Sequence, residues 1–184
     1  MCCDCIANGL AVGPSRRSLV LGLAGMAVAS SLAPTARAEP ADADDERFMR
    51  IAIAEARRAD FPFGAVIVRE GRLIARGRNL GRRRDDPTAH GEMVAIRRAL
   101  ASRGSRTLRG CTLYTSGEPC AMCMGAILWC RFGRLVYAAS VEQLATKIDQ
   151  IMISSQDLAA KTPFVPIQIR GGVLADEAMS LFAR

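Results

Sequence analysis

The sequence predicts a three-layer α/β/α sandwich around a five-stranded mixed sheet, and three observations support this prediction. Two short apolar runs flank Glu70-Gly71, a pattern typical of a β-hairpin. Beyond the hairpin, predicted strands alternate with predicted helices, which favours a sheet that is parallel in its C-terminal part and covered on both faces. Half of the 184 residues are apolar, which is enough for the core of one domain.

The N-terminal half of the predicted domain contains a helix, a hairpin and a second helix. Apolar residues recur at helical spacing over residues 42–59. Residues 65–68 and 72–76 are the two strands of the hairpin. The arginine-rich stretch 77–87 is predicted to be a loop, and helical periodicity resumes over residues 89–102.

The C-terminal half continues the alternation of strands and helices. Residues 119–130 form a predicted helix that is apolar on nearly all sides, so we expect it to be buried. Residues 141–161 are predicted to be mostly helical. The remaining predicted elements are strands over residues 111–115, 135–139 and 166–170 and a last helix over residues 174–182.

The first 38 residues have the features of an export signal. The apolar run Leu19–Leu32 is too short to span a bilayer comfortably, and Ala36-Arg37-Ala38 has the small-x-small pattern of a cleavage site. Ser15-Arg16-Arg17 precedes the run with the paired arginines of a twin-arginine signal. A retained apolar helix is the alternative. We expect residues 1–38 to be removed, which leaves a periplasmic domain of residues 39–184 without a membrane segment.

The charge of the chain is weak evidence for nucleic-acid binding. The formal net charge is +7, but only two of the 25 basic residues are lysine, so the arginine bias is compositional. One Trp, two Tyr and six Phe also do not suggest a platform on which single-stranded bases stack. We therefore expect no nucleic-acid partner.

One histidine and two cysteines have the pattern of a zinc site. His90 is the only histidine, which excludes any metal site or mechanism that needs two histidines. It stands at the start of a predicted helix, and Cys120 and Cys123 stand at the start of another. One imidazole and two thiolates suit Zn²⁺ with a fourth position left for water, and cysteines at i and i+3 face the same side of a helix. Glu92 is close enough to serve that water without binding the metal.

Two motifs carry a family resemblance. Pro87-Thr-Ala-His-Gly-Glu92 and Gly117-Glu-Pro-Cys-Ala-Met-Cys123 together resemble the zinc-dependent cytidine/nucleobase deaminase superfamily, whose signature is H-x-E followed by P-C-x-x-C. The resemblance covers about residues 63–139 and implies a cytidine deaminase-like fold with one zinc ion per chain. It also implies that Glu92 deprotonates a zinc-bound water, which attacks the ring carbon bearing an amine, and that Glu92 passes protons to the departing ammonia.

The cysteines and Glu92 also have interpretations that need no metal. A C-x-x-C pair is also typical of thiol–disulfide proteins, but a redox pair requires neither His90 nor Glu92. Glu92 by itself would be an exposed carboxylate favoured by a helix start. Cys111 and Cys130 lie in a predicted strand and a predicted buried helix, so we interpret them as small core residues.

The resemblance implies four substrate contacts. Asn79 stands where family members place a substrate-binding amide, although a turn-forming Asn is the alternative. Trp129 matches a tryptophan near the base in guanine deaminase-like proteins, or it packs in the core. Phe63 borders the pocket or packs beneath it. Asp149 falls where guanine deaminase-like members carry an acid that contacts the base.

The substrate is expected to be a small nucleobase or nucleoside. The pattern from Leu113 to Trp129 looks most like bacterial guanine deaminases, whereas Gly91 looks like fungal-type cytosine deaminases, where it would permit close backbone packing beside the metal. The tRNA-editing branch carries a different loop where this chain has Val141–Lys147. An exported protein meets free bases rather than tRNA, so we favour a guanine-like purine, with cytosine second and a tRNA adenosine deaminase-like enzyme as the alternative.

A role without catalysis and a dimeric assembly are also considered for this chain. A zinc-stabilised binding module without catalysis is the alternative from another functional class. In this superfamily the region that corresponds to residues 140–184 often supplies substrate contacts and a dimer interface, so we expect a homodimer.

Overall fold

The computed structural model describes residues 43–104, 108–164 and 166–182. The chain divides into two units, Met1–Ala38 and Glu39–Arg184, and the described residues all belong to the second. The export signal proposed for residues 1–38 lies outside the described residues. Among the helices that are described, none is long and apolar enough to cross a membrane.

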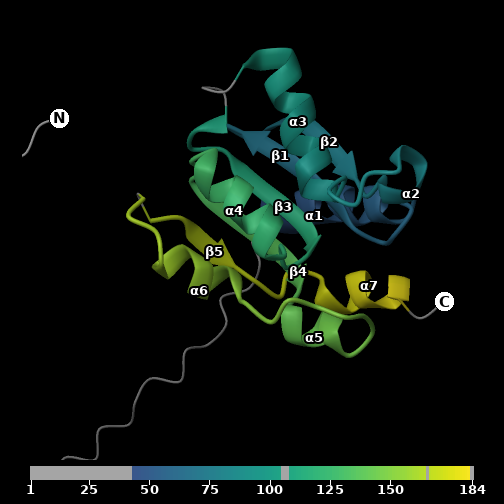
Figure 1. The fold of residues 1–184 in the computed structure, drawn as a ribbon. Coiled ribbons are helices and arrows are strands. Elements are labelled where there is room, and N and C mark those ends of the chain that lie inside the picture. The colour runs from purple at the N-terminus through teal and green to yellow at the C-terminus, as the bar shows by residue number, and fades with distance from the viewer. Residues whose placement is uncertain (1–42, 105–107, 165, 183–184) are drawn as a thin grey trace, which may run out of the picture. The chain divides into compact units, whose positions relative to one another are not determined.

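Five strands form one mixed sheet in the order β2-β1-β3-β4-β5, as Figure 1 shows. The pairings β1–β2 and β1–β3 are antiparallel, and the pairings β3–β4 and β4–β5 are parallel, so the predicted mixed sheet is confirmed. The hairpin turns at Glu70-Gly71, where both residues have positive φ. The strands are β1 (Gly64–Arg69), β2 (Arg72–Arg78), β3 (Thr112–Gly117), β4 (Arg134–Ala139) and β5 (Gln168–Arg170).

Helices cover both faces of the sheet, which confirms the predicted three layers (Figure 1). One face packs against α1 (Ala43–Ala56) and α7 (Ala175–Met179). The other face packs against α3 (Gly91–Arg103), α4 (Ala121–Trp129) and α6 (Ser155–Ala160).

Alternating side chains along the strands build one apolar core on each face. In β1, Ala65 and Ile67 belong to the core beneath α3 and α4, whereas Val66 and Val68 belong to the core beneath α1. This alternation follows from the two-residue period of a strand. Both faces of the central strands are therefore removed from water, and this burial is the main source of the stability of the fold.

A buried carboxylate fastens α1 to three strands. Asp45 is 1% exposed and accepts hydrogen bonds from the Tyr114 hydroxyl (2.9 Å), from Nη2 of Arg134 (2.6 Å) and from Nη1 of Arg170 (2.9 Å). Burial by itself raises the pKa of Asp45, but the bonds from Arg134 and Tyr114 and the two positive charges outweigh it and lower the pKa. The ionised carboxylate is therefore the form that the fold stabilises.

Two predicted segments are wrong in their secondary structure. The arginine-rich stretch 77–87 is not all loop, because β2 continues to Arg78 and the short helix α2 (Gly81–Arg84) follows. The predicted helix over residues 141–161 is instead α5 (Val141–Ala145) and α6, with no helix between them over residues 146–154. The side chains of Ser140 and Ser154 cap these helices, so each serine begins a separate short helix.

Two other predictions are wrong in detail. The helix α4 is not buried on all sides, because Met122 is 36% exposed and Trp129 is 75% exposed. The apolar composition of this helix did not separate its two faces, since polar residues are lacking on both. The predicted helix over residues 174–182 is divided into α7 and a 3₁₀ turn over Ser180–Phe182.

Candidate metal centre and adjoining cavity

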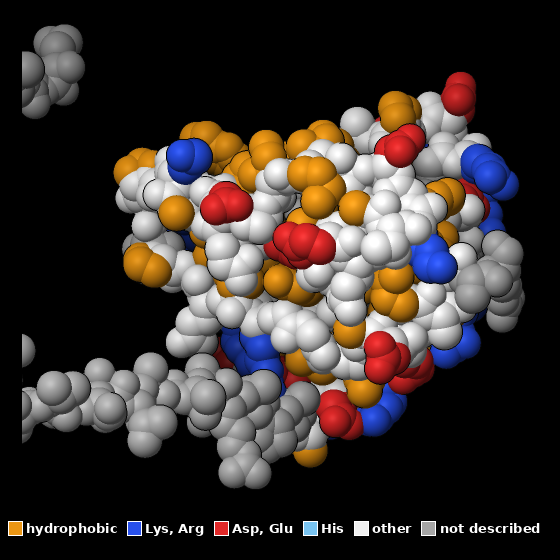
Figure 2. Space-filling model, turned by 90° about the horizontal axis from the view of Figure 1, so that it is seen from below, with side chains coloured by type: hydrophobic (Ala, Val, Ile, Leu, Met, Phe, Trp, Pro, Cys, Tyr) orange, Lys and Arg blue, Asp and Glu red, His pale blue; other side chains and the backbone are white. Residues whose placement is uncertain are grey.

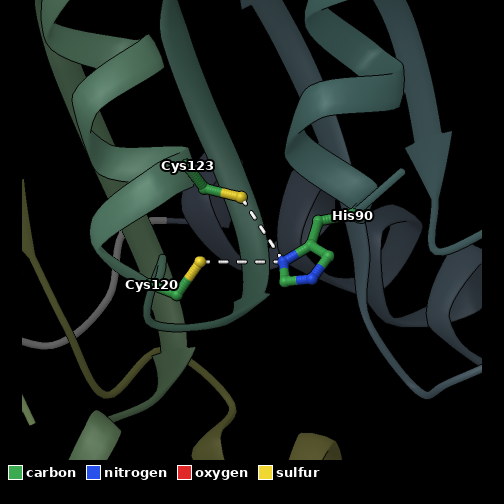
Figure 3. A group of neighbouring side chains, drawn as sticks. All are labelled: His90, Cys120 and Cys123. Atoms are coloured by element: carbon green, nitrogen blue, oxygen red, sulfur yellow. Dashed lines mark hydrogen bonds between the residues drawn. The ribbon is translucent and has the colours of Figure 1, made fainter. Parts of the chain in front are cut away.

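The three predicted metal ligands meet where two helices begin. His90 is the N-cap residue of α3, Cys120 is the N-cap residue of α4, and Cys123 lies in the first turn of α4. Figure 3 shows the imidazole of His90 pointing from one helix start toward both thiols on the other. Because α4 follows β3 directly, the cluster lies beyond the C-terminal end of that strand, a common place for sites in α/β sheets.

The geometry of this donor set fits one zinc ion. The Nδ1 atom of His90 lies 3.7 Å from the Sγ atom of Cys120 and 3.7 Å from that of Cys123. Ligand atoms bound tetrahedrally to zinc by ordinary Zn–N and Zn–S bonds are about 3.6 Å apart. The possible ligand atoms of the three residues all lie within 4.8 Å of one another. One nitrogen and two sulfurs leave the fourth tetrahedral position open.

The two thiols share protons unequally. The pKa of Cys120 is lowered to about 4, first by a hydrogen bond with the Cys123 side chain and then by His90, against the opposing effect of burial. The pKa of Cys123 is raised, because it hydrogen-bonds to Cys120 and is buried. A hydrogen bond with Cys120 also raises the pKa of His90. A metal ion that displaces these shared protons therefore binds with proton release.

Glu92 lies beside the ligands and is buried. Its side chain accepts a hydrogen bond from the Thr115 hydroxyl at Oε1 (3.2 Å), and its Oε2 lies 3.6 Å from Sγ of Cys123. The residue is 3% exposed, and burial raises the pKa of its carboxyl group. The alternative of an exposed helix-start carboxylate is therefore wrong. The arrangement allows Glu92 to hold or release a proton next to the metal site.

A close backbone approach sets the position of His90 and Glu92. A Cβ atom on Gly91 would lie 3.0 Å from the carbonyl oxygen of Phe63 and 3.2 Å from Cα of Gly64. Contacts this short with backbone atoms leave little room for a side chain, so α3 begins directly against the start of β1. The expected close packing at Gly91 is confirmed.

An open cavity of about 600 Å³ adjoins the centre. His90 lies on its wall, together with three of the four predicted substrate contacts: Phe63, Asn79 and Asp149. The cavity is within the size range of small-molecule sites. Other residues on its wall include Asp60, Arg82, Pro87, Ile148 and Gln150.

The three predicted contacts on the wall differ in their surroundings. Asn79 is buried, and its Oδ1 accepts the backbone N–H of Gly81 (3.0 Å), so the turn interpretation is correct and the residue also lines the cavity. Phe63 is half-buried, and its ring stacks on that of Phe61 with centroids 6.0 Å apart. Asp149 is exposed within the segment 146–154.

The structure does not bring Trp129 to this cavity. Its ring packs edge-on against Phe164, with centroids 5.2 Å apart, at the C-terminal end of α4. A helix rises about 1.5 Å per residue, so the end of α4 lies about 13 Å along its axis from Cys120. Within this chain Trp129 is separated from the metal centre by the length of the helix.

The sequence interpretation missed Glu118, Thr115 and Gln150. Glu118 is buried and accepts backbone N–H groups from two later helices, and Gln150 lines the cavity. A signal for Glu118 was present, because a carboxylate between a buried strand and a buried helix requires hydrogen-bond partners. No local pattern distinguished Thr115 from its strand neighbours or placed Gln150. Cys111 and Cys130 pack with the core beneath α3 and α4, as predicted.

Comparisons with known proteins agree with this site. The sequence profile named "Cytidine and deoxycytidylate deaminase zinc-binding region" matches residues 42–139. The guanine deaminase of Bacillus subtilis (strain 168) is 54% identical over 78 residues, which are 42% of this chain and 50% of that protein. The chain thus spans about half the length of this curated relative.

Two groups of solved structures share the fold. A tRNA:A34 deaminase structure, from work on A-to-I editing at the wobble position of transfer RNA, has a TM-score of 0.64 and 34% identity. The match covers 73% of this chain and 98% of that chain. The guanine deaminase from Nitrosomonas europaea has a TM-score of 0.66 and 26% identity over 75% of this chain and 82% of that chain.

Proposed function

The chain belongs to the cytidine and deoxycytidylate deaminase zinc-binding family, and from this premise we propose that it is a zinc-dependent hydrolytic deaminase of a small nucleobase or nucleoside. A guanine-like purine is the favoured substrate, and cytosine is second. The reaction consumes one water, replaces an exocyclic amine on a ring carbon with oxygen, and releases ammonia.

The observation that carries this proposal is the position of Glu92. The carboxylate is buried with Oε2 3.6 Å from Sγ of Cys123 and is held by Thr115. It lies beside a His–Cys–Cys donor set, of which His90 also lines the cavity. A structural zinc site has four protein ligands, whereas a hydrolytic site has three and an open position. A buried carboxylate next to an open position is the arrangement that proton transfer to and from water requires.

The residues of the chain have separate tasks in this reaction. A bound zinc ion supplies a nucleophile at neutral pH by lowering the pKa of water to roughly 7. Oε2 of Glu92 accepts one proton from the water and delivers it to a ring nitrogen. As the C–N bond breaks, the same carboxylate accepts the second proton of that water from the attacking oxygen and delivers it to the amine, which leaves as ammonia. The Thr115 hydroxyl holds Oε1 and so keeps the carboxylate oriented. The cavity wall, including Phe63, holds the ring beside the centre.

The purine preference rests on the cavity and on the relatives. Asn79 and Asp149 place an amide and a carboxylate on the wall, and a carboxylate there accepts N–H donors from the edge of a purine such as guanine. Both the Bacillus subtilis relative and the Nitrosomonas europaea structure are guanine deaminases.

A tRNA adenosine deaminase is the second candidate, favoured by the tRNA:A34 deaminase structure, which the match covers almost completely. The face in Figure 2 mixes basic, acidic and apolar side chains and shows no continuous basic stripe, which does not favour an RNA backbone on that face. The third candidate, a zinc module without catalysis, leaves a buried Glu92 beside an open ligand position without a role.

Location and assembly are part of the same proposal. We propose that residues 1–38 direct the domain to the periplasm through the twin-arginine route, because Arg16 and Arg17 precede an apolar run. We also propose a homodimer. The exposed apolar side chains of Met122 and Trp129 on α4 support an interface on that helix.

An ammonia-release screen tests the proposed function. The zinc-loaded protein is incubated separately with guanine, cytosine, adenine, their nucleosides and a tRNA anticodon stem-loop. We expect release from a free base or nucleoside, with guanine fastest. Release from the stem-loop alone would establish the second candidate instead, and no release from any of these compounds would favour the zinc module.

A further inference from the structure

Glu118 is a buried carboxylate without an ion-pair partner among the described residues. It is 4% exposed, and none of the ion pairs between described side chains includes it. Burial of an isolated carboxylate is costly unless hydrogen bonds satisfy its oxygens. The partners of Glu118 are therefore the reason that the group can remain buried.

Both oxygens of Glu118 accept backbone N–H groups at helix starts. Oε2 accepts the N–H of Val141 (2.9 Å), and Oε1 accepts the N–H of Ser155 (2.7 Å). Val141 is the first residue of α5 and Ser155 is the first residue of α6. N–H groups in the first turn of a helix have no partner within that helix, and bonds to a carboxylate are among the stronger hydrogen bonds. One side chain thus fixes the starts of two helices.

These two contacts stand on either side of the segment 146–154, which we call the cavity loop. Ile148, Asp149 and Gln150 of the cavity loop line the 600 Å³ cavity. The described backbone hydrogen bonds donated from within the loop are local, since none spans more than four residues. The loop therefore depends on its two ends for its position against the metal centre.

The backbone of Glu118 is itself fixed beside the ligands. Its N–H donates to the carbonyl of Ala139 (2.7 Å), and Cys120 follows two residues later. Glu118 also borders a small cavity of about 40 Å³ together with His90, Glu92 and Gln150. The residue lies between the metal centre and the loop that faces it.

We propose that Glu118 is a positioning residue that holds the cavity loop, and with it Asp149 and Gln150, against the substrate cavity, so that it determines substrate affinity and selectivity. The inference rests on the proposed function for its kinetic part only. Glu118 acts through the loop and does not touch the reacting atoms.

Two substitutions each remove a hydrogen bond between Glu118 and a helix start. Glu118→Gln keeps one acceptor oxygen but turns an amide NH₂ toward the second N–H group. Ser155→Pro removes the N–H that Oε1 accepts, and proline is well tolerated at the first position of a helix. If Glu118→Gln does not fold, Ser155→Pro still tests the hydrogen bond between Ser155 N–H and Oε1 of Glu118.

The kinetic measurement separates binding from chemistry. Both variants are expected to keep one zinc per chain, to raise the KM of the best base by about 10-fold, and to lower kcat much less, because the loop loses its place while Glu92 keeps its own. Discrimination between guanine and cytosine should shrink. Asp45→Asn is the matched control: it alters a buried carboxylate remote from the cavity and should reduce stability without changing KM. An unchanged KM in both variants, or an equal rise in the control, would overturn the proposal.

A second measurement requires no activity. The only lysines are Lys147, in the cavity loop, and Lys161, at the end of α6. A lysine-specific protease should therefore cut after Lys147 faster in Glu118→Gln and Ser155→Pro than in the unsubstituted protein or in Asp45→Asn. Equal cutting in all four proteins would refute the positioning role even if a base is deaminated. Faster cutting without deamination of any base would support the positioning role while the proposed function fails.

Discussion

Sγ of Cys120 lies 3.7 Å from Nδ1 of His90, although the two residues are 30 positions apart in the sequence. Each is the N-cap residue of its own helix, so the contact joins the starts of α3 and α4 across the end of the sheet. The three candidate metal ligands are therefore positioned by helices that pack against the sheet, and not by the cavity loop.

The first prediction concerns metal content. The protein as purified should contain one zinc per chain, and His90→Ala and Cys120→Ser should each contain far less, because two remaining donors make a weak site. Cys130→Ser is the control, since Cys130 packs against the core and should not bind metal. Zinc and protein are measured by mass spectrometry and absorbance. Full zinc in His90→Ala would place the metal elsewhere.

The second prediction concerns substrate contact. Asp149→Asn should raise KM by about 10-fold for a purine, since a hydrogen bond from an N–H donor to a charged acceptor is lost, with a smaller effect on kcat. Trp129→Ala should leave the KM of the isolated chain's site unchanged, because the structure places the indole at the far end of α4. The comparison is a steady-state assay of the three proteins. A larger rise in KM in Trp129→Ala than in Asp149→Asn would show that Trp129, and not Asp149, contacts the substrate.

The third prediction concerns stability at acid pH. The pKa of Asp45 is lowered in the fold, so its stabilising contribution is present above the unfolded pKa of about 3.9 and is lost as pH falls through the lower folded value. Asp45→Asn should lower the free energy of unfolding by roughly 3 kcal/mol at pH 7. It should also flatten the fall in stability below about pH 4. Urea unfolding of both proteins at several pH values measures this, and parallel curves would contradict it.

The fourth prediction concerns export. If the twin-arginine route carries the folded domain, zinc enters before Cys120 and Cys123 meet an oxidising compartment. Replacing Arg16 and Arg17 with lysine should leave the protein in the cytoplasm. Sending the same domain unfolded through the general secretory route should give less zinc and more Cys120–Cys123 disulfide. Equal zinc by both routes would remove this reason for folding before export.

The sequence was sufficient for the mixed sheet, for the three layers and for a His–Cys–Cys cluster that fits one zinc ion. The continuous apolar run of β1 beside Glu70-Gly71 indicated the hairpin, and the motifs around His90 and Cys120 place candidate ligands at predicted helix starts. These features depend on local spacing, which is readable one segment at a time. Glycine at position 91 was also interpretable, because a close backbone approach excludes a side chain.

The cavity loop was not predictable in the same way. Its ends are fixed by Glu118, which is 23 residues from Val141 and 37 residues from Ser155, so no local pattern records the contact. The prediction that residues 141–161 are mostly helical failed there, because serine caps and a distant carboxylate determine where α5 and α6 begin. The residue type of Trp129 likewise did not show that its ring packs against Phe164, at the end of α4 away from the metal centre.

The measurement that tests the central claim most directly is ammonia release by zinc-loaded protein and by zinc-loaded Glu92→Gln. The substitution keeps the size of the side chain and the contact with Thr115 but removes the group that accepts a proton. We predict one zinc per chain in both proteins, release of ammonia from a purine base by the unsubstituted protein, and a rate at least about 100-fold lower in Glu92→Gln. Equal rates in the two zinc-loaded proteins would contradict the assignment of Glu92 and of the reaction.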